Sequence, residues 1–400
     1  MKKCIALLSA IALVFVLCSC NSGNNKDSEN QNAGKIENSV AVESMGNNNF
    51  ALVYDDQPFY TTRSAMMVSS GEGYYFFVQD QLFYYDINSK TCVLVCGKPD
   101  CEHKNYALEN EDNQCNAFIP SDIFYYEKGF SYYDGDLYLL GKNSKDKYAV
   151  SIYRISPDGS EREEVCKIFS ISDQNDIGEF AVHRGYAFCS LRTSESTAAL
   201  YRVNLSNFNA DIICEADGMA SEFNRIAGSG NYIYFSKLCS EDDTYEKWIG
   251  KICRADIESG KVEEICDNLG SFAVIEESVY FLNFKNLDFV YVCDTASKEV
   301  TELIKAPDAS NMLLTDGKYL YLYYDSENSD TVNIVSTDGK IIDKIKVPNF
   351  YLIQGGGTDF LFVETVEYGL QAFDKSKIGT GVYDADTVYS IKEDKFVLNQ

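Results

Sequence analysis

The chain contains 400 residues, of which 61 are Asp or Glu and 35 are Lys or Arg, and its formal net charge at pH 7 is −26. So acidic a surface repels the phosphate backbone of nucleic acids and the headgroups of anionic lipids. We therefore expect no nucleic-acid partner, and attachment to a membrane would need a device other than surface charge. The length is sufficient for one large domain with a short N-terminal extension.

The first 19 residues have the pattern of a bacterial export signal. A basic start at Lys2 and Lys3 precedes an apolar run over residues 5–17, which is too short to span a bilayer comfortably. The run ends in Leu-Cys-Ser-Cys, which resembles a bacterial lipobox. The resemblance implies transfer of a diacylglyceryl group to Cys20 and cleavage before it, and two acyl chains anchor a protein stably. We expect a lipoprotein signal peptide over residues 1–19, and the alternative is an ordinary signal peptide with an incidental cysteine.

Residues 20–49 begin with the cysteine expected to carry lipid and are dominated by Asn, Ser, Gly and Glu. This composition predicts a flexible tether that holds the exported domain off the membrane. The folded domain is expected over residues 50–400. Its first apolar run, FALVY at residues 50–54, is a candidate strand for closing the domain against its last repeat.

Residues 130–168 contain a unit that the rest of the chain repeats. Apolar runs are separated by an Asp-Gly turn and a Pro-Asp-Gly turn, and Asp-Gly between apolar runs is a strong hairpin signal. The unit therefore predicts four antiparallel strands. They are expected at residues 130–133, 137–140, 149–155 and 163–168.

Looser copies of this unit fill most of the chain, beginning near residues 65, 180, 226, 272, 311 and 351. About seven copies with a period of about 40–50 residues are typical of propeller repeats. Tyr and Phe, 29 and 24 in number, crowd the expected strands, and runs with helical periodicity are absent after the N-terminus. We predict an all-β fold, a β-propeller of about seven four-stranded blades. A β-sandwich or an irregular all-β protein is the alternative.

Eleven cysteines remain once the signal peptide is removed and Cys20 is lipidated. An odd number cannot all pair within one chain. Cys166, Cys214 and Cys266 occupy the same place in the fourth strand of successive copies, and equivalent points on neighbouring blades lie beyond the Cα limit of about 7 Å for a disulfide. We expect these three, and Cys253, to be small apolar packing residues. Free thiols in an exported chain suggest an anoxic habitat.

One group of cysteines differs from the others. Cys96, Cys101, His103 and Cys115 lie between the first and second copies, in the spacing C-x4-C-x-H-x11-C. Three sulfurs and one imidazole suit a tetrahedral Zn²⁺, although the spacing is not that of a standard zinc finger. A disulfide such as Cys101–Cys115 is the competing interpretation, and unlinked thiols are the third. Either linkage is expected to be a structural clip on an inter-blade loop, because a catalytic zinc needs an open coordination position and a general base.

No catalytic motif is recognised in the sequence. His103 belongs to the cysteine group, and His183 is expected to be an exposed residue of a tight turn, so neither predicts the proton shuttle of a nucleophilic triad. The patterns G-x-S-x-G, H-E-x-x-H and the P-loop are absent. Propeller glycosidases need only positioned carboxylates, and the sequence alone does not single out a pair among 61 acidic residues.

The lipobox, the Asn- and Ser-rich tether, the segment CGKPDCEH…CNAF and the repeated Asp-Gly turns together resemble low-GC Gram-positive (clostridial-type) surface lipoproteins. These carry a TolB-like β-propeller domain of unknown function. The resemblance covers about residues 65–385 and implies an anchored extracytoplasmic propeller, without an activity. We therefore predict a lipid-anchored module that binds an envelope protein or a glycan. The alternative is a surface hydrolase acting on glycans or peptides.

Overall fold

The computed structural model describes residues 67–398, except for residues 97, 99–100, 102–114, 147, 171–176, 195, 243–245, 325–329, 349, 358, 366–368 and 393–394. The expected signal peptide, Cys20, the tether and the candidate strand at residues 50–54 lie outside the described residues. In the part of the chain that is described, no helix has the length and apolarity needed to cross a membrane.

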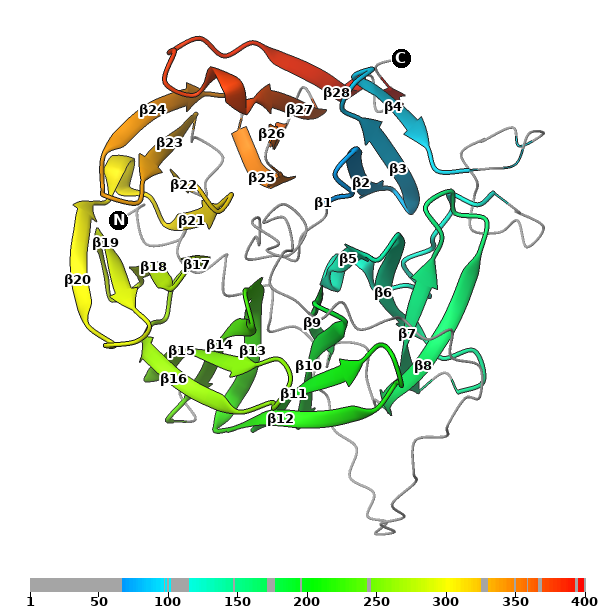
Figure 1. The fold of residues 1–400 in the computed structure, drawn as a ribbon, viewed down its shortest axis with the longest axis horizontal. Coiled ribbons are helices and arrows are strands. Elements are labelled where there is room, and N and C mark those ends of the chain that lie inside the picture. The colour runs from blue at the N-terminus through cyan, green and yellow to red at the C-terminus, as the bar shows by residue number, and fades with distance from the viewer. Residues whose placement is uncertain are drawn as a thin grey trace, which may run out of the picture. The chain divides into compact units, whose positions relative to one another are not determined.

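Seven antiparallel sheets follow one another along the chain, which confirms the predicted propeller (Figure 1). We number these sheets blades 1–7. Blade 1 contains β1 (Met67–Ser69), β2 (Gly73–Val78), β3 (Gln81–Asp86) and β4 (Thr91–Leu94). Blade 2 contains β5 (Phe130–Tyr133), β6 (Asp136–Lys142), β7 (Ala149–Ile155) and β8 (Arg162–Ser170). Blade 3 contains β9 (Ile177–His183), β10 (Tyr186–Ser194), β11 (Thr197–Asn204) and β12 (Ala210–Asp217).

The remaining four sheets have the same order of strands. Blade 4 contains β13 (Met219–Ser229), β14 (Tyr232–Ser240), β15 (Trp248–Asp256) and β16 (Val262–Asp267). Blade 5 contains β17 (Phe272–Ile275), β18 (Ser278–Asn283), β19 (Asn286–Asp294) and β20 (Val300–Lys305). Blade 6 contains β21 (Met312–Thr315), β22 (Tyr319–Tyr323), β23 (Thr331–Ser336) and β24 (Ile341–Lys346). Blade 7 contains β25 (Phe350–Gly356), β26 (Phe360–Thr365), β27 (Gly369–Asp374), β28 (Ala385–Lys392) and β29 (Lys395–Leu398).

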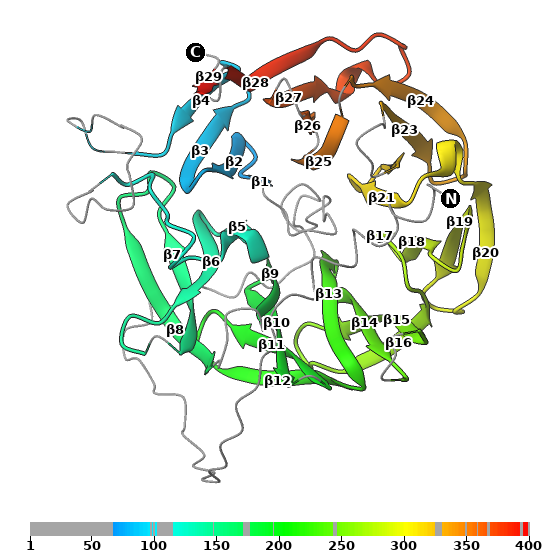
Figure 2. The ribbon, with the colours of Figure 1, turned by 180° about the vertical axis from the view of Figure 1, so that it is seen from behind.

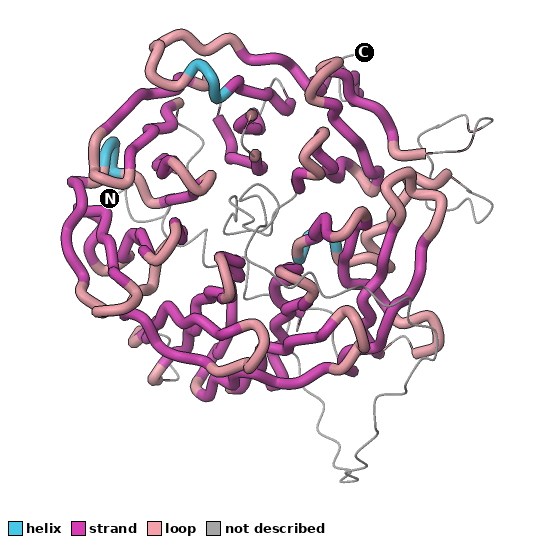
Figure 3. Tube along the Cα trace, viewed as in Figure 1, coloured by secondary structure: helices cyan, strands magenta, loops and turns pink. Residues whose placement is uncertain are grey.

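The first strand of each blade lies toward the inside of a ring and the fourth toward its circumference (Figures 1 and 2). First strands of neighbouring blades contact each other, as in the pairs β1 and β5, β5 and β9, β9 and β13, β13 and β17, and β17 and β21. Contact between β25 and β1 closes the ring. The described helical segments are the short 3₁₀ turns η2 (Tyr126–Lys128), η4 (Pro307–Ala309) and η5 (Lys375–Lys377) (Figure 3).

The hydrophobic core is divided among the interfaces between neighbouring blades. Seven clusters of buried side chains each join the facing surfaces of two sheets. Between blades 1 and 7, for example, Phe76 and Tyr85 pack with Phe362 and Leu370. A single twisted sheet cannot bury both of its faces alone, so each blade depends on its two neighbours. In the described part of the chain, side-chain packing between blades 1 and 7 closes the ring.

A buried ion pair also joins blades 6 and 7. Lys375 of η5 pairs with Asp316, which lies in the turn between β21 and β22, and their side chains are only 8% and 1% exposed. Asp316 also accepts a hydrogen bond of 2.7 Å from the hydroxyl of Tyr321, and Lys375 donates to the carbonyl of Gly357. Removal of either charge would leave the other buried and uncompensated, so the pair holds these two blades together.

The four-stranded unit predicted from the sequence is confirmed. Residues 130–133 and 149–155 coincide with β5 and β7, and each of the other two strands extends one or two residues further at each end. Asp134 and Gly135 have φ values of 50° and 88°, the left-handed conformations that an Asp-Gly hairpin turn requires. Blade 7 differs from the prediction because it carries a fifth strand, β29, beyond β28.

Candidate functional site

The structure brings together the three described cysteines of the predicted group. The Sγ atoms of Cys96, Cys101 and Cys115 all lie within 4.8 Å of one another, and all three are free thiols. Ligands of a tetrahedral zinc with Zn–S bonds of about 2.3 Å are separated by about 3.8 Å. This proximity is compatible with a shared metal ion. His103, the fourth expected ligand, lies outside the described residues.

This cysteine group sits against the neighbouring blade. Cys96 follows β4 of blade 1, whereas Arg162 begins β8 of blade 2. The Nη2 atom of Arg162 donates hydrogen bonds to the carbonyls of Cys115, at 3.4 Å, and Asn116. A zinc ion held by three thiolates and one imidazole would carry a net charge of −1, and the adjacent guanidinium would compensate it. The cysteine group therefore lies between blades 1 and 2.

A second group of charged residues lies on the first strands of blades 3 and 4 and on the neighbouring strand β10, and we call it the inner-strand cluster. It consists of Glu179 on β9, Arg192 on β10, and Glu222 and Arg225 on β13. Arg192 Nη2 lies 3.8 Å from Glu222 Oε2, and their side chains are 32% and 40% exposed. The charges of Arg192 and Glu222 are therefore within reach of water.

A β-bulge in β13 positions the inner-strand cluster. The register of β13 against β14 shifts between Asn224 and Ala227, and Arg225 within the shift has a φ of 56°. Left-handed backbone is costly for a residue with a side chain and recurs where a bulge redirects side chains at functional sites. The bulge leaves the Ile226 amide free of the ladder, and this amide donates a hydrogen bond of 3.0 Å to Glu179 Oε2.

Burial perturbs the ionisation of the cluster. It raises the pKa of Glu179 to about 7, against the opposing effects of the Ile226 amide and the Arg225 charge. Burial also raises the pKa of Glu222, which Arg192 and Arg225 oppose, and lowers the pKa of Arg225, which both carboxyl groups oppose. A carboxyl group whose pKa burial raises toward neutral pH, beside the charge of Arg225, is typical of binding and catalytic sites.

Sequence reasoning missed the inner-strand cluster. The first strands of blades 5 and 6 read FAVI and MLLT, whereas β13 carries the charged and polar sequence SEFNR. This departure from an apolar first strand is the signal that could have identified it. The bulge that brings Arg225 and Glu179 together has no clear signature in the residue pattern.

The expectation that His183 is an exposed turn residue is wrong. His183 is the last residue of β9 and is only 2% exposed, and its Nε2 lies 2.8 Å from the carbonyl oxygen of Gly230. The ring packs against Gly228 of blade 4, where a Cβ atom would lie 2.4 Å from Nδ1. The turn itself begins one residue later, and the imidazole is part of the interface between blades 3 and 4.

The cysteines of the fourth strands do not meet one another but share inter-blade clusters with cysteines of the next blade. We call these the cross-blade cysteine pairs: Cys166 with Cys189, Cys214 with Cys253, and Cys266 with Cys293. All six are free thiols, and burial raises the pKa of Cys166 and of Cys253 to about 12. Thiols that are neutral and enclosed in this way behave as small apolar groups, in line with the packing role predicted from the sequence.

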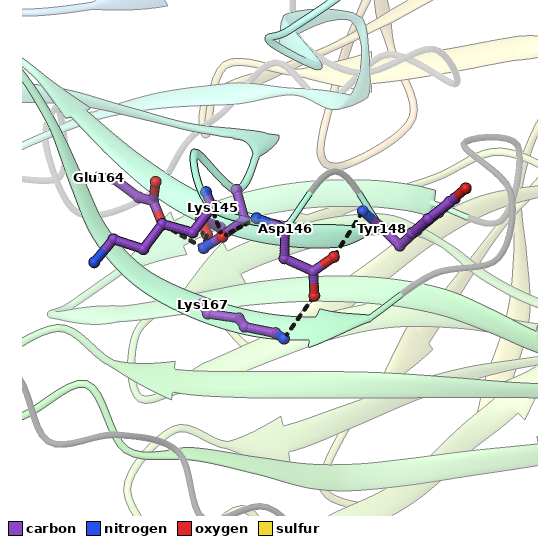
Figure 4. A network of polar contacts seen from close by, with 7 residues as sticks. Lys145, Asp146, Tyr148, Glu164 and Lys167 are labelled. Atoms are coloured by element: carbon purple, nitrogen blue, oxygen red, sulfur yellow. Dashed lines mark hydrogen bonds and ion pairs between the residues drawn. The ribbon is translucent and has the colours of Figure 1, made fainter.

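A further polar network holds the loop between β6 and β7 and has a structural role (Figure 4). Glu164 of β8 accepts hydrogen bonds from the Ser144 amide at 2.8 Å and the Ser151 hydroxyl at 3.0 Å. Asp146 accepts one from the Tyr148 amide and pairs with Lys167 of β8 at 3.2 Å. The carboxylates of this network are satisfied by the loop and by β8, so the network offers little to a ligand.

Comparison with known proteins supports the fold and no particular activity. No family model matches the chain, and no curated protein matches it. Puromycin hydrolase has a TM-score of 0.52 at 10% identity over 84% of this chain and 57% of its own. A mutant of puromycin hydrolase complexed with PGG has a TM-score of 0.53 at 9% identity over 83% and 55%. A chain of a mitotic checkpoint complex has a TM-score of 0.49 at 9% identity over 88% and 95%. Identities this low show a shared propeller fold alone.

Proposed function

We propose that this protein is a lipid-anchored extracytoplasmic β-propeller that binds a ligand at the cell envelope. The observation that carries the binding role is the inner-strand cluster, where two guanidinium and two carboxyl groups lie on β9, β10 and β13 of two neighbouring blades. A cation that only supported the fold would be expected to pair directly with a carboxylate, as Arg192 does with Glu222, because an unpaired charge away from bulk water costs free energy. Arg225 makes no such ion pair among the described residues. An envelope protein or a glycan is the expected ligand.

The anchor is supported by the lipobox-like sequence that ends at Cys20 and by the polar segment that follows it. Cys20→Ala removes the acceptor thiol and should move the protein from the membrane fraction to the medium or the soluble fraction. Cys293→Ser, a substitution within the propeller, is the matched control and should leave the protein in the membrane fraction. An unchanged membrane fraction for Cys20→Ala would refute lipid anchoring.

The binding role is tested by photo-crosslinking on intact cells with the tagged full-length protein. A specific protein or glycan should be captured, and Arg225→Gln should reduce its capture. Arg154→Gln removes the same charge from an exposed position on blade 2, where Arg154 is 39% exposed, and should capture as the wild type does. Equal capture by all three forms would place binding away from the inner-strand cluster.

A surface hydrolase is the second candidate, and one observation favours it. Glu179, with a pKa of about 7, lies near Glu222, whose charge acts on it. Glycoside hydrolases use such a protonated carboxyl group as the acid and a second carboxylate as its partner. Turnover of glycans by the wild-type protein that is abolished in both Glu179→Gln and Glu222→Gln would establish this activity and displace simple binding.

The cysteine group is the candidate site for a structural zinc. The sulfur atoms of Cys96, Cys101 and Cys115 lie close enough to share one ion, and His103 would complete four ligands. Zinc bound there would fix the connection between blades 1 and 2 and would take no part in ligand chemistry.

A further inference from the structure

We propose that the inner-strand cluster receives a carboxylate group of the ligand, with Arg225 as its principal partner and Arg192 beside it. This inference rests on the binding function proposed above and gives it a chemical class.

Arg225 is the cation of the cluster that has no close partner. Among the described residues no carboxylate oxygen lies within 4.0 Å of its guanidinium nitrogens, although the charges of Glu179 and Glu222 both act on it. The Arg225 side chain is half-buried. Its strained backbone holds this cation in place without the help of a salt bridge.

Two neighbouring polar atoms are also unsatisfied. Arg192 Nε and Asn224 Oδ1 are buried and have no hydrogen-bond partner in the structure. Asn224 uses its amide nitrogen to donate to Glu222 Oε1 at 3.1 Å, whereas its side-chain oxygen accepts no hydrogen bond. Buried polar atoms in native proteins are nearly always bonded, so these two atoms and the Arg225 cation are available to a polar ligand.

The charge of the cluster favours a carboxylate over a phosphate. Its two guanidinium groups are opposed by Glu222 and by Glu179, which is only partly ionised near neutral pH because its pKa is about 7. The excess positive charge is thus smaller than one unit, and one additional negative charge balances it best. A dianionic phosphate would overcharge the cluster inside a protein whose net charge is −26. The planar guanidinium fork matches the two oxygens of a carboxylate in a bidentate pair.

Carboxylates of two sources fit this description, the C-terminus of a peptide and the acid group of a sugar acid. Isothermal titration calorimetry of the purified full-length protein distinguishes them with two pairs of probes. The first pair is N-acetyl-alanyl-alanine and its C-terminal amide, and the second is glucuronate and glucose. We expect one of the two acids to bind and its neutral counterpart to bind at least about 10-fold more weakly, as loss of a charge-assisted hydrogen bond implies.

Three variants assign the binding to the cluster. Arg225→Gln should weaken binding of the acid by about 10- to 100-fold. Arg225→Lys keeps the charge but loses the planar guanidinium group, so its affinity for the acid should lie between those of the wild type and Arg225→Gln. Arg154→Gln should bind as the wild type does. Circular dichroism should show that all three variants remain folded, because Arg225 makes no ion pair that its loss would break.

The outcomes separate this inference from the proposed function. Equal binding of acid and amide, or equal affinities of the wild type and Arg225→Gln, would overturn the carboxylate receptor while a ligand captured on cells would still support the binding role. A wild-type protein that binds neither acid, yet captures a ligand through Arg225 on cells, would also overturn it. Failure of capture on cells together with turnover of a glycan would refute the proposed function itself.

Discussion

Substitution of Glu179 by Gln should stabilise this protein at alkaline pH. Gln is uncharged and keeps a side-chain oxygen that can accept the Ile226 amide, which donates to Glu179 Oε2 at 3.0 Å. The variant therefore removes the cost of holding a negative charge between blades 3 and 4 and retains the hydrogen bond.

The size and sign of the effect follow from the ionisation of Glu179. Burial raises its pKa from an ordinary 4.5 to about 7, so between these values the folded protein binds more protons than the unfolded chain. Stability must then fall as the pH rises through this window. A pKa shift contributes about 1.4 kcal/mol per unit, so the free energy of unfolding falls by at most about 3.4 kcal/mol over this window. Because water reaches this half-buried side chain and screens its charge, we expect about 2 kcal/mol.

Urea unfolding of the wild type and Glu179→Gln at pH 5 and pH 8 measures this difference. At pH 5, which is only half a unit above the ordinary pKa of 4.5, the variant should be more stable by less than about 1 kcal/mol, and at pH 8 it should be more stable by about 2 kcal/mol. Glu299→Gln, at an exposed position on the outer edge of blade 5, is the control and should follow the wild type. A Glu179→Gln protein that is less stable than the wild type at pH 8 would refute the reasoning, since it would mean that the ionised carboxylate stabilises the fold.

Three further predictions concern other parts of the ring. Elemental mass spectrometry of the purified protein should find one equivalent of zinc. Cys101→Ser should lose the zinc, whereas Cys293→Ser should keep it. A folded wild-type protein without metal would contradict the zinc site. Asp316→Asn should lower the free energy of unfolding by about 3 kcal/mol because it leaves Lys375 buried without its partner, whereas Asp338→Asn, at an exposed surface pair, should have no measurable effect. Alkylation after unfolding, followed by mass spectrometry, should find the cross-blade cysteine pairs as thiols, and a disulfide within any of them would show that they are inter-blade crosslinks.

The blades could be predicted from the sequence because recognisable turn residues separate their strands. Asp134 and Gly135 mark a hairpin in the chain itself, and the strands on either side were placed to within two residues. The fifth strand of blade 7 was not predicted, because β29 follows a segment whose repeat pattern is weak. Local signals such as turn residues and apolar runs thus determine the repeating unit, and they carry less information where the repeat ends.

The candidate sites were predicted less completely, since they depend on contacts between blades. Cys96, Cys101 and Cys115 could be grouped from their spacing because one loop carries them all. The environment of His183 could not be predicted, because its burial depends on Gly228 in the next blade. The inner-strand cluster likewise depends on the bulge in β13 and on the position of β13 beside β9. No local sequence pattern predicts either of them.

The most direct test of the proposed role compares the affinities of the wild type and Arg225→Gln for a carboxylate probe and for its neutral amide by calorimetry. The account predicts that the wild type prefers the acid by at least about 10-fold and that Arg225→Gln loses this preference. A wild type that binds acid and amide equally, or a variant that keeps the preference, would contradict it.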